Sequence, residues 1–371
     1  MLRALLLAAT LAAGSGAALA QTAPIAATPA VAPSRYAALA KDGDFVVRDF
    51  KFRSGETLPE LKMHYLTLGT PKRDAAGNIV NAVMVLHGTS GSGRQFLQPQ
   101  FADELYGPGQ PLDLAKTYVI LPDNIGHGAS SKPSDGLKMR FPSYDYDDMV
   151  EAQRRLLVDG LGVKKLRLLM GTSMGCMHGF VWGEANPGFV QAMMPMACLP
   201  APIAGQNRMW RKLAMDAIKA DPAWNGGNYT APPAQGMRTA ATLLAIVGGN
   251  PLALAKQLPT REAVDKSLEG RIERDNASRD ANDLIYQINS SRNYDPSKGL
   301  EKMTMPVAWI NSSDDFINPP GLGIAEPAAK RLPNGTYRLI EGTPETKGHG
   351  THTWAKFWKA DLIELLKRSE K

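Results

Sequence analysis

Cysteine is scarce in this chain of 371 residues, which contains only Cys176 and Cys198. A zinc site needs three or four ligands at defined spacing, and neither cysteine belongs to such a pattern, so the sequence predicts no metal site. Two cysteines outside the cytoplasm can form a disulfide, but an isolated cysteine often behaves as a small buried hydrophobic side chain. We expect both to be buried in this way, with a disulfide between them as the alternative.

Concentrated charge is also lacking. The formal net charge of +6 is spread along the sequence, without a block of five or six basic residues or a basic stripe interleaved with aromatic residues. Proteins that bind nucleic acid concentrate such residues on one surface, so we expect no nucleic-acid partner. With 44% hydrophobic and 21% charged residues, the chain is instead suited to bury a large core.

Long apolar runs are absent from the chain after its N-terminal region. No segment in that part approaches the ~18 consecutive apolar residues of a membrane span. Residues 1–20 have the positive start, the apolar middle and the small-residue "ALA" end of a secretory signal peptide. Residues 21–35 are rich in alanine and proline and predict a linker. We therefore expect a periplasmic or secreted protein whose mature chain has no stable membrane span.

Short apolar runs alternate with helical patterns along most of the remaining chain. Near-continuous apolar runs predict strands covered on both faces, and an alternating run predicts a strand at a sheet edge. Alternation of strands with helices predicts an α/β fold, with a mostly parallel sheet between two helical layers. An N-terminal pair is expected at one edge of the sheet, and the alternating last run at an edge as well. The expected strands are residues 44–52, 62–70, 81–88, 117–123, 165–171, 303–311 and 335–342.

This alternation of strands and helices is interrupted between residues 199 and 300. Three segments there have helical patterns, 206–222, 236–249 and 278–293, joined by Pro- and Gly-rich stretches without a clear strand. A helical insert of this size predicts a cap over the carboxyl ends of the strands, where ligands bind in such sheets. The expected division is a core of residues 36–198 and 301–371, with a helical cap of residues 199–300.

One serine lies between two glycines in "GTSMG", residues 171–175. An apolar run precedes it and helix-forming residues follow, which is the strand, turn and helix context of a G-x-S-x-G nucleophile elbow. The glycines are needed because the turn brings the strand and helix backbones too close for a Cβ atom. The helix N-terminus would then stabilise an oxyanion beside the hydroxyl. We therefore predict that Ser173 is a catalytic nucleophile.

A serine nucleophile of this kind needs an orienting acid later in the chain. Asp314 and Asp315 directly follow the strand expected at 303–311. We prefer Asp315, because it lies four residues before Pro319, where such loops turn into the next helix. Asp314 is the alternative, and its other interpretation is a turn or capping residue.

The base is expected after the last strand, in the motif "GHGTH". His349 lies between two glycines and ahead of the final helix, so it is free to reach the serine and is our preferred base. His352 is expected to begin that helix. The His-x-x-His pair offers two ligands only, which is too few for a metal site.

The oxyanion donors are expected to be backbone N–H groups on both sides of the serine. Met174 follows the nucleophile directly, and Thr89 lies in the loop "HGTSGSG" after the strand that ends near residue 87. His87 and His178 are interpreted as structural residues.

The motifs together carry a family resemblance. The set "HGTSGSG", "PDNIGHGASS", "GTSMGCMHG", "DDFINPP" and "GHG" resembles the α/β-hydrolase superfamily, and "AIKADPAWNGGNY" at residues 217–229 is similar to the cap of the homoserine O-acetyltransferase family. The similarity spans roughly residues 45–367. It implies the hydrolase fold, a helical cap and a ping-pong mechanism through an acyl-serine, with Ser173, Asp315 and His349 as its triad.

Two positions depart from that family. The resemblance implies an arginine for the homoserine carboxylate where this chain has Met215, and an aspartate for the substrate amine where it has Gly350. Each lost charge-assisted pair is worth on the order of 1.5 to 3 kcal/mol, so amino-acid recognition should be weak. Arg208 and Arg211 could instead meet an acidic substrate, although arginines on a helix surface are more often solvated.

The sequence thus predicts a secreted or periplasmic serine hydrolase that cleaves an acyl ester or related carbonyl through an acyl-Ser173 intermediate. Its partner would be a small acyl substrate, with no metal or organic cofactor, and a homodimer is left open. The first alternative is a CoA-dependent O-acyltransferase resembling homoserine O-acetyltransferase. The second is a non-catalytic extracytoplasmic binding protein on the same fold.

Overall fold

A computed structural model describes residues 33–370. The predicted signal peptide, residues 1–20, and most of the predicted linker lie outside the described residues. The prediction that the linker extends to residue 35 is wrong at its end, because Ser34 is buried and its hydroxyl hydrogen bonds to Asp103. Tyr36 then packs edge-on against Tyr106, with 6.1 Å between the ring centroids, so Ser34 and Tyr36 both belong to the packed core.

The core is an eight-stranded sheet with strand order β1-β2-β4-β3-β5-β6-β7-β8. Strand β2 pairs antiparallel with β1 and β4, and all the other pairs are parallel. This confirms the α/β class, with the N-terminal pair at one edge and the last strand at the other. The strands are β1 Lys41–Lys51, β2 Thr57–Gly69, β3 Ala82–Leu86, β4 Tyr118–Pro122, β5 Leu168–Thr172, β6 Met193–Met196, β7 Val307–Ser312 and β8 Gly335–Ile340.

Strand β6 is absent from the sequence-based prediction. It has only four residues, and one of them is Pro195, which has no N–H to donate to a neighbouring strand and is uncommon inside a sheet. It nevertheless lies between β5 and β7 with all four residues buried. The alternation of strands and helices is therefore interrupted after residue 196, and the first core segment was expected to end at residue 198.

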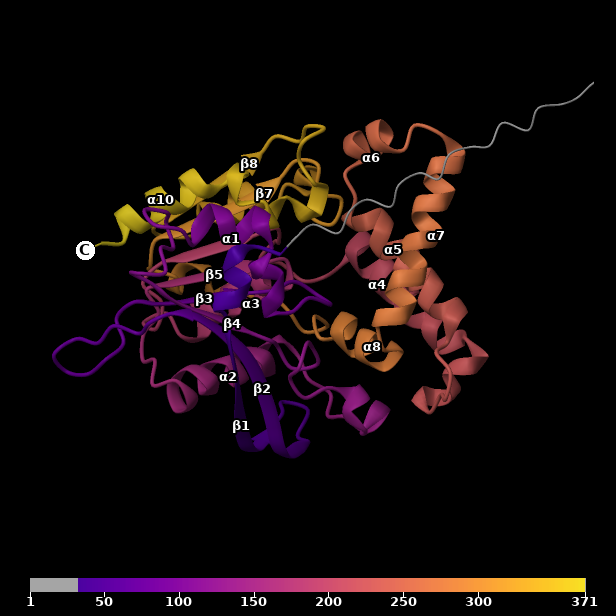
Figure 1. The fold of residues 1–371 in the computed structure, drawn as a ribbon, viewed down its shortest axis with the longest axis horizontal. Coiled ribbons are helices and arrows are strands. Elements are labelled where there is room, and N and C mark those ends of the chain that lie inside the picture. The colour runs from indigo at the N-terminus through magenta and orange to yellow at the C-terminus, as the bar shows by residue number, and fades with distance from the viewer. Residues whose placement is uncertain (1–32, 371) are drawn as a thin grey trace, which may run out of the picture. The chain divides into compact units, whose positions relative to one another are not determined.

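Helices cover both faces of the sheet (Figure 1). Alternate residues of β3 belong to different apolar clusters, Met84 and Leu86 to one and Val83 and Val85 to the other, as the two-residue period of a strand requires. The first cluster includes residues of α2 Tyr146–Arg155, α3 Met174–Ala185 and α9 Ala325–Ala329. The second includes residues of α1 Pro99–Leu105 and α10 Lys359–Arg368.

Five α-helices lie between β6 and β7, and we call the segment that contains them, residues 205–289, the cap. The cap has its own apolar cluster, which includes Met215, Met237 and Leu284, and Figure 1 shows its helices gathered beside the sheet. The sequence pattern predicted α4, α5 and α8 but not α6 or α7. In α7 only Ile272 is buried, so no apolar stripe identifies it as a helix. The helices are α4 Gly205–Ala220, α5 Ala234–Gly248, α6 Pro251–Gln257, α7 Arg261–Ser278 and α8 Ala281–Asn289.

Within residues 33–370, no single helix is both long enough and apolar enough to cross a membrane. Only α5 and α6 taken together pass that test, and they are bent by 105° at the break between them.

The two cysteines form a disulfide, which corrects our preference for two separate buried thiols. Cys176 on α3 bonds to Cys198 just after β6, with 5.9 Å between the Cα atoms. The sequence could not decide this, because Cys198 follows the strand that the pattern missed. The bond ties the helix that begins at Ser173 to the loop leaving β6.

Removing the disulfide is expected to destabilise the protein by about 3 kcal/mol, because it closes a loop of 22 residues and constrains the unfolded chain. The double variant Cys176→Ala/Cys198→Ala should show this in guanidinium unfolding. Reductant should lower the midpoint of the wild type and leave that of the double variant unchanged. Equal midpoints for the oxidised wild type and the double variant would contradict the prediction.

Candidate active site

Ser173 occupies a sharp turn between β5 and α3. Its backbone has φ 55° and ψ −111°, a left-handed conformation that non-glycine residues adopt rarely and that costs energy. A Cβ atom on Gly171 would lie 2.0 Å from the carbonyl oxygen of Gly175, and one on Gly175 would lie 2.1 Å from the carbonyl oxygen of Leu86. Both positions therefore require glycine, for the reason that the motif implied.

The structure brings together the three residues predicted to act as a triad. The Ser173 hydroxyl lies 2.8 Å from Nε2 of His349, and Nδ1 of His349 lies 2.8 Å from Oδ2 of Asp315. Each residue lies beyond the carboxyl end of a strand: Ser173 after β5, Asp315 after β7 and His349 after β8. A base in contact with the serine and an acid in contact with the base is the arrangement that activates a hydroxyl for attack on a carbonyl.

Asp315 is held as an anion. Its carboxylate is 1% exposed and accepts hydrogen bonds from the N–H of Ile317 at 2.8 Å and from the Asn318 side chain at 3.0 Å. Burial alone would raise its pKa, but His349 and the donors of Asn318 and Ile317 outweigh burial and lower the pKa below its usual value. The carboxylate is thus ionised at neutral pH and orients the imidazole.

Asp314 has a different position. It accepts a hydrogen bond from the Thr346 hydroxyl at 2.6 Å and one from the N–H of Gly348 at 3.1 Å. Asn250 in the cap reaches the same loop, because its side-chain amide donates to the Thr346 carbonyl at 2.8 Å. Asp314 therefore holds the loop that carries His349 and does not contact the imidazole.

His352 does not begin the last helix, as we had expected. It lies in the 3-10 turn Gly348–Thr353, while α10 begins at Lys359. Its ring is 5.2 Å from that of His349 in an edge-on arrangement, and burial followed by the neighbouring His349 lowers its pKa to about 3. It is therefore neutral. Among residues 33–370, no group of three or more His, Cys, Asp or Glu side chains could hold a metal ion.

Two backbone N–H groups are free to receive an oxyanion. Neither Thr89 nor Met174 donates a backbone hydrogen bond to any part of the chain that the structure describes. The loop after β3 passes directly against the nucleophile, since a Cβ on Gly88 would lie 3.3 Å from Cβ of Ser173. Both predicted donors are thus placed beside the serine with their hydrogens unused.

His87, which we interpret from the sequence as structural, holds the peptide group that carries the N–H of Thr89. The N–H of Asn124 donates to its Nε2 at 3.1 Å, so the ring proton is on Nδ1, which donates to the Gly88 carbonyl at 2.8 Å. In a trans peptide the Gly88 carbonyl and the Thr89 N–H point in opposite directions. Fixing the carbonyl therefore fixes the N–H. Burial lowers the pKa of His87 and keeps the ring neutral.

Replacing His87 by leucine is expected to lower kcat for ester cleavage about tenfold, less than the 10²- to 10³-fold that follows loss of an oxyanion donor itself. KM should change less than kcat, because the carbonyl oxygen needs this donor most in the transition state. His87→Asn, whose amide can replace the Nδ1 donor, should recover part of the loss. Equal losses in both variants, or a change in KM alone, would show that His87 only fills space.

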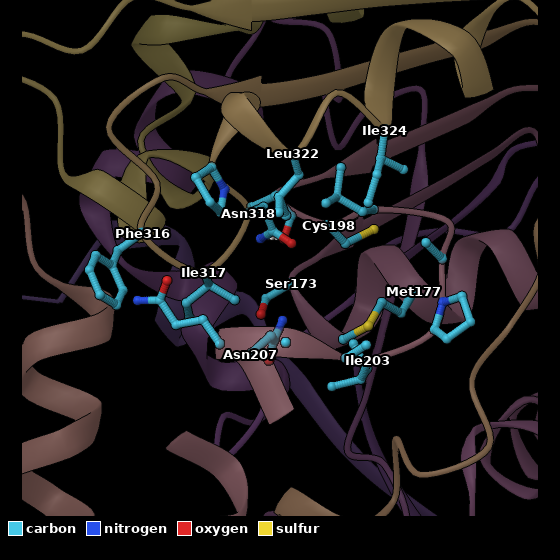
Figure 2. Close-up of a pocket in the computed structure, with 18 of the residues that line it drawn as sticks. Ser173, Met177, Cys198, Ile203, Asn207, Phe316, Ile317, Asn318, Leu322 and Ile324 are labelled. Carbon is cyan, nitrogen blue, oxygen red and sulfur yellow. Dashed lines mark hydrogen bonds between the residues drawn. The ribbon is translucent and has the colours of Figure 1, made fainter. Parts of the chain in front are cut away.

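Two lobes of one pocket meet at Ser173. The first, called the apolar lobe, has a volume of about 190 Å³, and Figure 2 shows its side chains arranged around the serine. The second, called the cationic lobe, has a volume of about 200 Å³ and also contacts Thr89 and His349. The apolar lobe is lined mainly by Met177, Leu199, Ile203, Phe316, Leu322 and Ile324. The cationic lobe includes Trp210, Arg271 and Arg279.

Three residues line both lobes: Ser173, Arg211 and Ile317. Arg211 is only 2% exposed, which corrects our expectation of a solvated arginine on the helix surface. The sequence held a signal that we did not use, because Arg211, Ala214, Met215 and Ile218 follow the i, i+3, i+4, i+7 spacing of one buried helix face. Arg208 lines neither lobe.

Comparison with known proteins shows the fold and the family of this chain. Residues 81–345 match the family model described as alpha/beta hydrolase fold. The homoserine O-acetyltransferase of Moorella thermoacetica is 33% identical over 309 residues, covering 72% of this chain and 80% of that protein. The enzyme of the same name from Solidesulfovibrio magneticus is 31% identical over 283 residues, covering 71% and 68%. The chain belongs to the α/β-hydrolase superfamily, in the homoserine O-acetyltransferase-like family.

Solved structures of this fold are also similar. The homoserine O-acetyltransferase from Bacillus anthracis superposes with a TM-score of 0.77 at 20% identity, covering 89% of this chain and 98% of that one. The acetyl esterase MekB superposes with a TM-score of 0.75 at 22% identity, covering 90% and 98%. At such identities the likeness shows the fold, which serves both transfer and hydrolysis in these two proteins.

The two positions where the sequence departs from the resemblance to homoserine O-acetyltransferases have distinct surroundings. Met215 packs in the apolar cluster of the cap and lines neither lobe. Gly350 has a backbone that accepts a side chain, since an added Cβ would meet only Cβ of Lys347 at 3.6 Å. Glycine is therefore not imposed there by packing.

Proposed function

We propose that this member of the homoserine O-acetyltransferase-like family is an extracytoplasmic serine hydrolase of acyl esters. The hydrogen-bonded chain from Ser173 through His349 to Asp315 supports chemistry through an acyl-serine. The observation that carries the choice of substrate is the absence of any described Asp or Glu from the lining of both lobes. An amino-acid acceptor such as homoserine would leave its ammonium group there without a counter-charge.

The mechanism follows from the contacts. His349 takes the proton of Ser173 as Oγ attacks the ester carbonyl, and the N–H groups of Thr89 and Met174 hold the oxyanion. Asp315 stabilises the imidazolium that forms. His349 then gives its proton to the leaving alkoxide, and the alcohol departs. A water molecule, deprotonated by His349, attacks the acyl-serine and releases the carboxylic acid with regeneration of Ser173.

Two features support a location outside the cytoplasm. The predicted signal peptide is one, and the disulfide between Cys176 and Cys198 is the other, because such bonds persist mainly in oxidising compartments. Acyl-CoA is a cytoplasmic metabolite and would be scarce there. This location therefore favours water over CoA-linked acyl transfer as the reaction partner.

A second candidate is acyl transfer to an alcohol acceptor, and the curated relatives favour it. The proteins from Moorella thermoacetica and Solidesulfovibrio magneticus both have transferase names and match most of this chain. In that case an acceptor hydroxyl would take the place of water in the second half of the reaction. The two candidates share every step up to the acyl-serine.

Steady-state turnover separates the candidates. The purified oxidised chain should be assayed with p-nitrophenyl esters of increasing acyl length, and separately with acetyl-CoA and homoserine. The hydrolase predicts free carboxylic acid in proportion to alcohol released, at a rate that does not depend on an acceptor. Homoserine-dependent release of CoA, with slow hydrolysis of the donor alone, would overturn this proposal in favour of transfer. Failure of an alkyl phosphonate to label Ser173 would indicate the non-catalytic alternative.

A further inference from the structure

Arg211 is a buried cation without a carboxylate partner. Its hydrogen-bond acceptors are neutral, the Asn207 side chain at 2.8 Å from Nε and the Ile288 carbonyl at 3.5 Å from Nη1. The Trp210 ring covers one side of the guanidinium, with 4.6 Å from Cζ to the ring centroid. None of the described Asp and Glu side chains forms an ion pair with it. Isolating a charge in this way is costly, so a retained arginine of this kind calls for an anion that is not part of the chain.

Part of the donor capacity of Arg211 is unused by the described chain. An arginine has five N–H donors, and the two contacts above use those of Nε and one of Nη1. No described protein group accepts from Nη2. Because Arg211 lines both lobes together with Ser173, its unused donors are available to a molecule bound at the nucleophile.

The positions of the triad and the oxyanion loop indicate which part of the ester meets Arg211. His349 must protonate the leaving oxygen, so the alcohol departs on the side where His349 is exposed. His349 and Thr89 line the cationic lobe and are absent from the lining of the apolar lobe. The acyl chain therefore fits the apolar lobe, and the alcohol part fits the cationic lobe.

The cationic lobe has an excess of positive charge. Arg271 and Arg279 line it together with Arg211. Among the described residues, Asp275 is the carboxylate that pairs with Arg271 and Arg279, 4.0 Å from Nε of the first and 3.5 Å from Nε of the second. Nη1 of Arg279 is buried without a hydrogen-bond partner. The lobe thus offers several donors to an anion, and its described lining residues include no acid for an ammonium group.

We infer that the cationic lobe binds a carboxylate on the alcohol part of the substrate, with Arg211 as the residue that determines this specificity. The substrates would then be acyl esters of hydroxy acids that have no amine beside the carboxylate. This inference rests on the proposed acyl-serine function. It places the anion-binding arginine one helical turn before Met215, the position where the family resemblance implies an arginine.

Three acetate esters with the same four-carbon alcohol chain test this. 4-Acetoxybutanoate carries the carboxylate, 4-acetoxybutanamide is its neutral counterpart, and O-acetylhomoserine adds an amine. Release of acetate gives kcat/KM for each. A charge-assisted pair should favour the carboxylate over the amide about ten- to hundredfold in the wild type. O-acetylhomoserine should be poorer than 4-acetoxybutanoate, because its ammonium has no partner.

Variants assign the preference to Arg211. Arg211→Gln should reduce the ratio of kcat/KM between carboxylate and amide to about 1, and Arg211→Lys should keep part of it because a charge remains. Arg208→Gln removes the same charge from the same helix but outside both lobes, so it should keep the wild-type ratio. Arg211→Met serves as a second variant, because an apolar side chain of similar length tolerates burial.

The outcomes are distinguishable. Equal kcat/KM for the carboxylate and the amide in the wild type would overturn the inference while leaving ester hydrolysis intact. An unchanged ratio in folded Arg211→Gln and Arg211→Met would overturn it as well, and a ratio lowered equally by Arg208→Gln would show a long-range effect of charge. Failure of all three esters and of phosphonate labelling would instead refute the proposed function.

Discussion

Ser173→Ala is expected to lower kcat for ester hydrolysis about 10⁵- to 10⁶-fold, as loss of a serine nucleophile does in other triads. The reason is local. Oγ of Ser173 lies 2.8 Å from Nε2 of His349 and is the atom that would form the acyl-enzyme, so the variant has no nucleophile. KM and substrate binding should change little, because the two lobes remain. Mass spectrometry after a rapid quench should detect an acyl adduct of the wild type and none of the variant.

Ser173→Gly provides a matched control for folding. Both variants lack the hydroxyl, but glycine is favoured at a φ of 55° whereas alanine is as strained as serine. We expect the free energy of unfolding of Ser173→Gly to be about 1 kcal/mol higher than that of Ser173→Ala. Both variants should be inactive. Activity in either variant above a thousandth of the wild type would show that another group is the nucleophile.

The parts of the fold that the sequence predicted well are those with a local signal. Strands β3, β4, β5 and β7 are buried along their whole length, and their near-continuous apolar runs are what a doubly covered strand requires. Strand β6 has the same burial but contains Pro195, and its place is set by its neighbours in the sheet. Helix α7 has one buried residue, so its existence depends on contacts that no periodicity displays.

The residues of the candidate active site also divide into those with a local sequence signal and those without one. Ser173 was identifiable because strand, turn and helix are contiguous, and the close approaches at Gly171 and Gly175 explain the motif. The choice of Asp315 over Asp314 depended on a proline spacing, and the structure shows the deciding contact between Asp315 and His349. The burial of Arg211 depends on how the cap packs over the core. A helical pattern shows which face is buried but not that the face meets the nucleophile.

Asp315→Asn is expected to lower kcat about 10⁴-fold, as the equivalent change does in a serine protease triad. The asparagine can still accept the N–H of Ile317, so the loop should keep its shape. Its amide, however, would present a donor to Nδ1 of His349. The imidazole proton would then move to Nε2, which faces Ser173 and could no longer accept the hydroxyl proton. NMR of the imidazole nitrogens should detect this change of tautomer.

Asp314→Asn is the matched control, since the adjacent residue undergoes the same change in charge and shape. Asp314 accepts from Thr346 and Gly348 and not from the imidazole, so its loss should loosen the His349 loop. We expect kcat to fall about tenfold or less, because only the position of the base is disturbed, together with a lower free energy of unfolding. The tautomer of His349 should be unchanged. A larger loss of kcat in Asp314→Asn than in Asp315→Asn would reverse the two roles, because it would mean that the imidazole turns toward Asp314 during the reaction.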